Sequence, residues 1–131
     1  MFIVGGTVAT ILVIDDEPGI RDLLDTLLRR KGYDVVVAES GQKGLEVFHR
    51  ERPDVVVLDL KMPGMDGLTV LQEVRRLNPL QPVIVLTGAA TAEAEEQVRV
   101  LGVTEFVEKE FSLHHLGDSL KRLLVHANPS T

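Results

Sequence analysis

The chain has 131 residues, of which 44% are apolar, and this length fits a single domain with one hydrophobic core. Its net charge of −6 disfavours direct binding to nucleic acid or to an anionic membrane, because phosphate groups would be repelled. It contains no cysteine, which excludes disulfides and cysteine-based sites, and no apolar run long enough to span a bilayer, so we expect a soluble cytoplasmic protein.

The predicted elements begin after an N-terminal extension, residues 1–8, which lacks the basic start of a signal peptide. The first strand is predicted at Ile11 to Ile14, a short run rich in β-branched residues. Apolar residues at helical spacing from Ile20 to Leu28 predict an amphipathic helix. Pro18 suits the first turn of that helix, and Gly32 suits its C-terminal end.

Four further pairs of strand and helix follow in the same alternation. The strands are predicted at residues 35–38, 55–58, 83–86 and 105–107. The helices are predicted from Ser40, a capping residue, to Pro53, from Leu68 to Asn78, from Thr91 to Leu101, and from Ser112 to the end of the domain at residue 126. We expect the tail, residues 127–131, to be disordered.

The alternation of strands and helices predicts an α/β fold with a (βα)₅, doubly wound arrangement around a five-stranded parallel sheet. The third strand is apolar throughout, so we expect helices to cover both faces of the sheet. In open sheets of this kind, ligands bind at the carboxyl ends of the strands. The residues that follow each predicted strand are therefore the candidates for a functional site.

Polar side chains follow every predicted strand. Asp15, Asp16 and Glu17 follow the first strand, Asp59 the third, Thr87 the fourth, and Glu108 and Lys109 the fifth. Glu39 follows the second, but we expect this strand to lie at the edge beyond the first, which would place Glu39 to one side. Carboxylates that lie this close repel one another unless a cation sits among them, and oxygen ligands of this type suit Mg²⁺. We expect Asp16 and Asp59 to be the direct ligands, with a backbone carbonyl from the loop after the third strand.

A carboxylate beside Mg²⁺ can attack phosphorus and form an aspartyl-phosphate. To catalyse phosphoryl transfer, a protein must mainly align the reacting groups and neutralise charge. Lys109 can form an ion pair with the phosphoryl group, and Thr87 can donate a hydrogen bond to it. Taken alone, Asp15 and Asp16 would be read as helix caps, Thr87 as a turn residue and Lys109 as a surface lysine. Because all of these residues are expected at the same edge of the sheet, a functional site is the favoured interpretation.

Four runs of sequence occur in order along the chain: Ile11 to Glu17 (ILVIDDE), Val55 to Gly67 (VVVLDLKMPGMDG), Ile84 to Gly88 (IVLTG) and Phe106 to Lys109 (FVEK). Together they resemble the response-regulator receiver domain of two-component signalling. The similarity covers about residues 9–125, so we assign residues 9–126 to the domain. The resemblance implies a flavodoxin-like fold with strand order 2-1-3-4-5.

The resemblance also implies a role for each site residue. Asp59 would accept the phosphoryl group, Asp16 would bind Mg²⁺ directly and Asp15 through water, the Lys61 carbonyl would be the backbone ligand, Thr87 and Lys109 would bind the phosphoryl group, and Phe106 would be the switch aromatic. The domain would catalyse only its own phosphorylation and dephosphorylation.

The resemblance implies partners as well. A sensor histidine kinase or a histidine phosphotransfer protein would supply the phosphoryl group. A downstream protein or effector domain would bind the face formed by the fourth helix, the fifth strand and the fifth helix. Neither direct binding to nucleic acid nor a membrane location is expected.

One departure from the family pattern lies after the fifth strand, where Glu110 follows Lys109 in place of the family's proline. A cis bond costs ~3–4 kcal/mol before a residue other than proline, against ~0.5–1 kcal/mol before proline. We therefore predict a trans bond here, or a strained cis one, and expect Glu110→Pro to sharpen phosphate-dependent behaviour. A second departure is Ala89, which has no side chain to orient an attacking water.

Two other functions remain open from the sequence. One is a pseudo-receiver, a protein-binding module that no longer accepts phosphate, and Glu110 is the feature that supports it. The other is a phosphatase with an aspartate nucleophile, but that class requires a second acid two residues after the nucleophile, where this chain has Lys61. The sequence also leaves open whether the chain is a stand-alone regulator or part of a longer protein.

Overall fold

The computed structural model describes residues 3–4, 7–60, 62, 64–87, 92–102, 105–108 and 113–127. The strands are β1 (Ile3–Val4), β2 (Thr7–Val8), β3 (Thr10–Ile14), β4 (Asp34–Ala38), β5 (Val55–Asp59), β6 (Val83–Thr87) and β7 (Glu105–Glu108). The helices are α1 (Pro18–Arg30), α2 (Gly41–Glu51), α3 (Gly67–Leu77), α4 (Ala92–Val100) and α5 (Leu113–Ala127).

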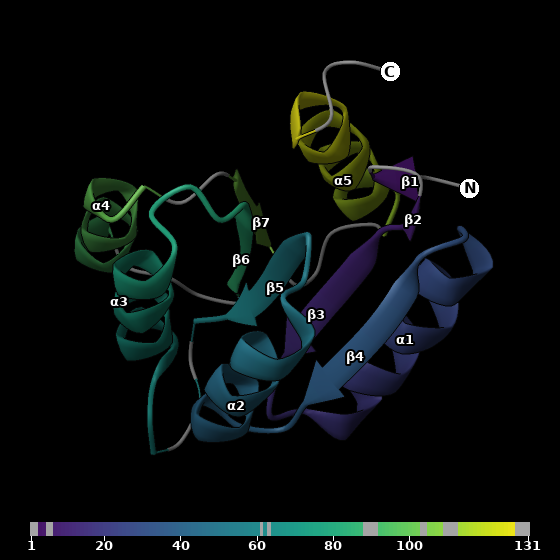
Figure 1. The fold of residues 1–131 in the computed structure, drawn as a ribbon. Helices are drawn as coiled ribbons and strands as arrows, with labels where there is room; N and C mark the ends of the chain where they lie inside the picture. The colour runs from purple at the N-terminus through teal and green to yellow at the C-terminus, as the bar shows by residue number, and fades with distance from the viewer. Residues whose placement is uncertain are drawn as a thin grey trace.

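The main sheet has five parallel strands in the order β4-β3-β5-β6-β7 (Figure 1). The first of these strands in the sequence, β3, lies between β4 and β5. The chain therefore adds β4 on one side of β3 and then β5, β6 and β7 on the other side. This order is the predicted 2-1-3-4-5 arrangement, and the expected doubly wound, flavodoxin-like α/β fold is confirmed. The boundary between β3 and β5 is the point at which such sheets bind ligands.

The hydrophobic core consists of two clusters, one on each face of the sheet. Successive residues of a strand point to opposite faces, so Ile11 and Val13 join the first cluster while Leu12 and Ile14 join the second. Residues of α1 and α5 complete the first cluster, and residues of α2, α3 and α4 complete the second. Figure 1 shows these two groups of helices on opposite sides of the sheet. Every residue of β5 is buried, as expected for a strand that is covered on both faces.

The ends of the helices are fixed by the residues that the sequence indicates. Pro18 occupies the first turn of α1, and the Ser40 hydroxyl accepts a hydrogen bond of 3.2 Å from the Lys43 amide at the start of α2. The Asp66 carboxylate caps α3 by accepting from the Thr69 amide at 2.9 Å. Among the described residues, no helix has both the length and the apolar character needed to cross a membrane.

The two ends of the chain differ slightly from the expectation. The predicted N-terminal extension contains a short antiparallel pair, β1 and β2, in which Ile3 is opposite Val8 and Val4 is opposite Thr7. All four residues are β-branched, and β-branched residues favour strands. At the other end, α5 continues to Ala127, one residue beyond the predicted domain boundary, and residues 128–131 lie outside the described part.

Candidate functional site

The pairing of β3 with β5 brings Asp15 and Asp59 together. Ile14 is opposite Leu58 in this parallel pair, so the next residue of each chain emerges at the same edge of the sheet. Asp15 is 0% exposed and Asp59 is 1% exposed. Two carboxylates are therefore buried side by side at the carboxyl ends of adjacent strands, where burial of charge is costly without compensation.

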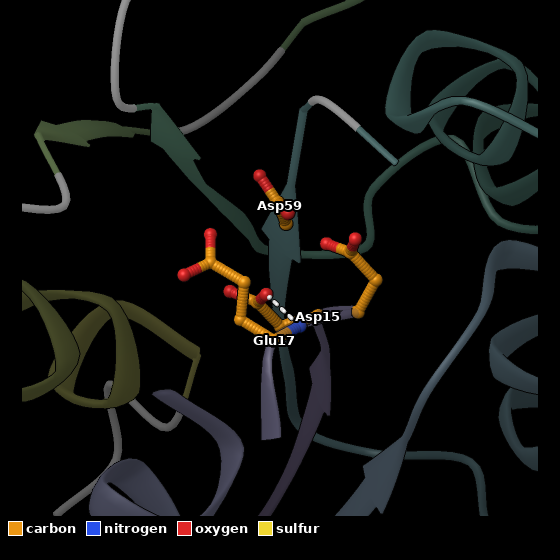
Figure 2. A group of neighbouring side chains, drawn as sticks. Asp15, Glu17 and Asp59 are labelled. Carbon is orange, nitrogen blue, oxygen red and sulfur yellow. Dashed lines mark hydrogen bonds between the residues drawn. The ribbon is translucent and has the colours of Figure 1, made fainter. Parts of the chain in front are cut away.

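Hydrogen bonds from neighbouring segments fix the position of Asp15. Its amide donates to the Ala38 carbonyl at 3.1 Å, which continues the pairing of β3 with β4. Its Oδ1 atom accepts a 2.9 Å hydrogen bond from the Glu17 amide, drawn as the dashed line in Figure 2, and its carbonyl accepts one of 2.9 Å from the Arg21 guanidinium. The first and third contacts hold the backbone of Asp15, and the second holds its carboxylate.

Four acidic residues form one group, which we call the acidic group: Asp15, Asp16, Glu17 and Asp59. One carboxylate oxygen from each lies within 4.8 Å of the others. Figure 2 shows Asp15 and Glu17 coming from the segment after β3 and Asp59 from the end of β5. Such an all-oxygen set of anions fits a hard divalent cation, which would relieve the repulsion between the carboxylates.

The other predicted site residues are placed only in part. The backbone of Thr87 ends β6 beside β5, where Leu86 is opposite Asp59, and the backbone of Phe106 lies in β7 opposite Val85. The side chains of Thr87 and Phe106 lie outside the described atoms. Lys61, Lys109 and the Lys109–Glu110 bond, predicted to be trans, also lie outside the described residues. The structure thus brings Asp15, Asp16 and Asp59 together, and the roles of all the predicted site residues stay predictions.

Two residues of the site received no role from the sequence. Glu17 joins the acidic group, although it is exposed and follows the two aspartates on the way into α1. Gly67, the first residue of α3, donates its amide to the Leu60 carbonyl at 3.0 Å, directly after Asp59. The signals were an acid adjacent to two others and a glycine at a helix start, but each also suits an ordinary helix N-terminus.

Comparison with known proteins identifies the family. A profile described as the response regulator receiver domain matches residues 11–121. The chain belongs to this family. Sporulation initiation phosphotransferase F of Bacillus subtilis is 33% identical to it over 114 residues, which cover 87% of this chain and 92% of that protein. The crystal structure of a CheY-like receiver domain protein from Methanospirillum hungatei matches with a TM-score of 0.91 at 26% identity, covering 95% of this chain and 100% of that chain.

Several relatives of this receiver domain are longer proteins. It is 36% identical over 126 residues to the probable transcriptional regulatory protein TcrX of Mycobacterium tuberculosis, which covers 96% of this chain and 54% of TcrX. It spans only 46% of the probable transcriptional regulator ycf27 of Guillardia theta. These relatives give no support to the expectation, drawn from the acidic composition, that the whole protein acts without nucleic acid.

Proposed function

We propose that this receiver domain is a phosphorylation-dependent switch that accepts a phosphoryl group on Asp59. The observation that carries the proposal is the position of the buried Asp59 carboxylate, within 4.8 Å of three other carboxylates at the carboxyl edge of a doubly wound sheet. The donor would be a phosphohistidine on a sensor histidine kinase or on a histidine phosphotransfer protein. A relative named for phosphotransfer, similar over almost its whole length, supports this assignment.

The acidic group is the proposed site of Mg²⁺. Asp16, Asp59 and the carbonyl of Lys61 would bind the ion directly, and Asp15 would bind it through water. The donor set fits the ion, because Mg²⁺ prefers oxygen ligands and commonly keeps several waters. When bound, Mg²⁺ would neutralise the carboxylates and polarise the phosphoryl oxygens.

Asp59 is the proposed nucleophile. One oxygen of its carboxylate forms a bond to phosphorus while the bond from phosphorus to the donor imidazole nitrogen breaks, and the electron pair of that bond stays on the nitrogen. The ammonium of Lys109 would balance negative charge on the transferred group, and the hydroxyl of Thr87 would donate a hydrogen bond to it. Hydrolysis of the acyl phosphate returns Asp59 to a carboxylate, so the domain acts on no substrate other than its own phosphoryl group.

The proposed output is a change in the face formed by α4, β7 and α5. A hydrogen bond from Thr87 to the phosphoryl group would vacate space into which Phe106 turns. The backbones of these residues lie on the adjacent strands β6 and β7, which gives the change a short path. The phosphorylated form must favour the active state by a few kcal/mol for the shift to matter. An NMR comparison with and without beryllofluoride tests this, and unchanged signals around Phe106 would refute it.

Intact-mass measurement tests the acceptor. The protein is incubated with acetyl phosphate and Mg²⁺, and we expect the mass of one phosphoryl group to be gained, then lost after base treatment. Asp59→Asn should gain nothing, whereas Asp54→Asn, at the opposite end of β5, should gain the group normally. A wild-type protein that binds Mg²⁺ but never gains phosphate mass would instead be a pseudo-receiver.

The same proposal includes the partners of the whole protein and its location in the cell. The chain spans about half of some regulators that it resembles, so an effector domain that binds nucleic acid could be joined to this one. A separate downstream protein is the alternative reader of the α4, β7 and α5 face. We keep the cytoplasmic location expected from the sequence, because it is there that a histidine kinase would present its phosphohistidine.

A further inference from the structure

We propose that Glu17 is a fourth carboxylate of the cation site and that its charge, acting through a water retained by the ion, tightens divalent binding. The inference rests on the proposed function, because it assumes that the acidic group holds Mg²⁺. It adds a residue for which the resemblance implies no role. Glu17 would set how much free Mg²⁺ the domain needs before it can accept a phosphoryl group.

The position of Glu17 on α1 supports this role. Glu17 is the residue at the N-cap of α1, with an extended backbone (φ −86°, ψ 114°), but its side chain makes no capping hydrogen bond. Capping would turn the carboxylate back onto the first turn of the helix. Instead, one of its oxygens lies within 4.8 Å of an oxygen from each of Asp15, Asp16 and Asp59.

The backbone of Glu17 is tied to the same group. Its amide donates to Asp15 Oδ1 at 2.9 Å (Figure 2), so the peptide that carries Glu17 is fixed relative to a buried member of the site. The side chain itself is exposed to solvent, in contrast to Asp15 and Asp59. This combination favours binding through water: the carboxylate stays at the open side of the site, where Mg²⁺ would keep its remaining waters.

The expected size of the effect follows from the charge. A carboxylate about 5 Å from a divalent ion, on the solvent side and at physiological ionic strength, should change the dissociation constant about three- to tenfold. The change is smaller than that for a direct ligand, because solvent screens an exposed charge. It should also be greatest at low salt and shrink as salt is added.

A matched pair of variants tests the inference by isothermal titration with MgCl₂, without any phosphoryl donor. Glu17→Gln should weaken Mg²⁺ binding about three- to tenfold at physiological ionic strength, and by more at low salt. Glu39→Gln removes the same charge from an exposed residue after β4, outside the acidic group, and should leave the dissociation constant within about twofold of wild type. Glu17→Asp keeps the charge and should lose less than Glu17→Gln. Equal urea midpoints for the three variants would show that each remains folded.

Three outcomes decide the matter. If Glu17→Gln binds Mg²⁺ as wild type does, or if Glu39→Gln weakens binding equally, the inference on Glu17 is overturned, while wild-type protein that binds Mg²⁺ and gains phosphate mass leaves the proposed function intact. If wild-type protein binds no Mg²⁺, the proposed function fails first and the inference fails with it. Selective weakening in Glu17→Gln supports both.

Discussion

Gly67 packs so closely against Asp59 that a Cβ atom added to Gly67 would lie 2.4 Å from the Asp59 carbonyl oxygen. The same atom would lie 2.6 Å from the Leu60 Cα, and both contacts are with backbone that has little freedom to move. The start of α3 thus rests directly on the segment that leaves β5 with the proposed acceptor. Any side chain at Gly67 would push this segment away.

The first prediction concerns this contact. Gly67→Ala should lower the free energy of unfolding by about 1–3 kcal/mol, because an added methyl group cannot be fitted without shifting backbone. It should also slow phosphorylation by acetyl phosphate, because the carboxylate of Asp59 moves with its backbone. Urea denaturation measures the first effect and intact-mass time courses the second.

Gly19 in α1 is the matched control for Gly67, since a Cβ there would have no atom within 4 Å. Gly19→Ala should change stability by less than about 1 kcal/mol, in the stabilising direction, because alanine favours helix more than glycine does. Phosphorylation should be unaffected. Equal destabilisation in the two variants would show that the close approach of Gly67 to the Asp59 backbone does not cause the loss of stability.

The second prediction concerns Arg75, whose guanidinium connects α3 to the end of α4. It donates to the carbonyls of Leu101 at 2.8 Å, Gly102 at 2.6 Å and Gln81 at 2.6 Å. Burial lowers the pKa of Arg75, but an arginine still stays charged at neutral pH. Arg75→Ala should lower stability by about 2 kcal/mol, since three carbonyls lose a charged donor.

Two variants sharpen the test of Arg75. Arg75→Lys should restore only part of the stability, because one ammonium cannot reproduce the fork of the guanidinium. Arg76→Ala removes an exposed arginine paired with Glu73 on the same helix and should have a much smaller effect. Urea denaturation ranks the variants, and amide exchange at the end of α4 should rise only when Arg75 is replaced. Similar losses for Arg75→Ala and Arg76→Ala would contradict this reading.

The third prediction concerns Tyr33, which is buried in the cluster formed with α1 and α5. Burial raises the pKa of Tyr33 from 10.0 to about 12, because the folded protein disfavours the charged phenolate. The folded-state pKa lies above the unfolded one, so the stabilisation by the neutral phenol is complete below pH 10 and is lost as the pH rises from 10 to about 12. Tyr33→Phe should lose less stability than wild type over that interval.

This titration can be followed directly, because the chain has one tyrosine and no tryptophan. The ultraviolet absorbance of tyrosinate therefore reports Tyr33 alone. In native protein it should rise with a midpoint near 12, and in urea-unfolded protein with a midpoint near 10. A native midpoint at 10 would mean that Tyr33 is solvated. The comparison with Tyr33→Phe separates its effect from that of lysines, which titrate in the same range.

The sequence was sufficient to predict the fold because its signals agree. The strands β3, β5 and β6 contain short apolar runs such as Val55 to Leu58, α1 and α3 have regular apolar faces, and residues such as Pro18 and Ser40 mark helix starts. Their strict alternation allows few topologies other than a doubly wound sheet. The β1–β2 pair was missed because two-residue strands are too short to produce a periodic pattern.

The site was predicted less completely than the fold, and for a physical reason. Aspartates that end buried strands, such as Asp59, are informative because charge there requires compensation. Glu17 lies at an exposed helix start, where acids occur for their interaction with the helix dipole alone, so the sequence could not separate the two roles. The tight approach of Gly67 depends on how α3 meets β5, which is a tertiary contact that no local pattern encodes.

The last prediction concerns the stability that the acidic group costs. Without metal, Asp15 and Asp59 are buried at adjacent strand ends among four carboxylates whose oxygens lie within 4.8 Å. Replacing Asp59 by asparagine removes one of the repelling charges and keeps the shape of the side chain. In buffer with EDTA at neutral pH, Asp59→Asn should therefore raise the free energy of unfolding by about 1–3 kcal/mol.

Adding Mg²⁺ should stabilise wild type more than Asp59→Asn and so offset the advantage of the variant. A ligand that binds only the folded state, at one hundred times its dissociation constant, stabilises by about 2.7 kcal/mol, and wild type should gain this increment while Asp59→Asn gains much less. Asp54→Asn is the control, because Asp54 accepts a 2.7 Å hydrogen bond from the Thr10 amide and lies outside the acidic group. It should lose stability slightly and keep the full response to Mg²⁺. Carboxylates gathered to bind a cation should repel one another when the cation is absent. If Asp59→Asn were less stable than wild type in EDTA, this repulsion would not be the dominant effect on stability.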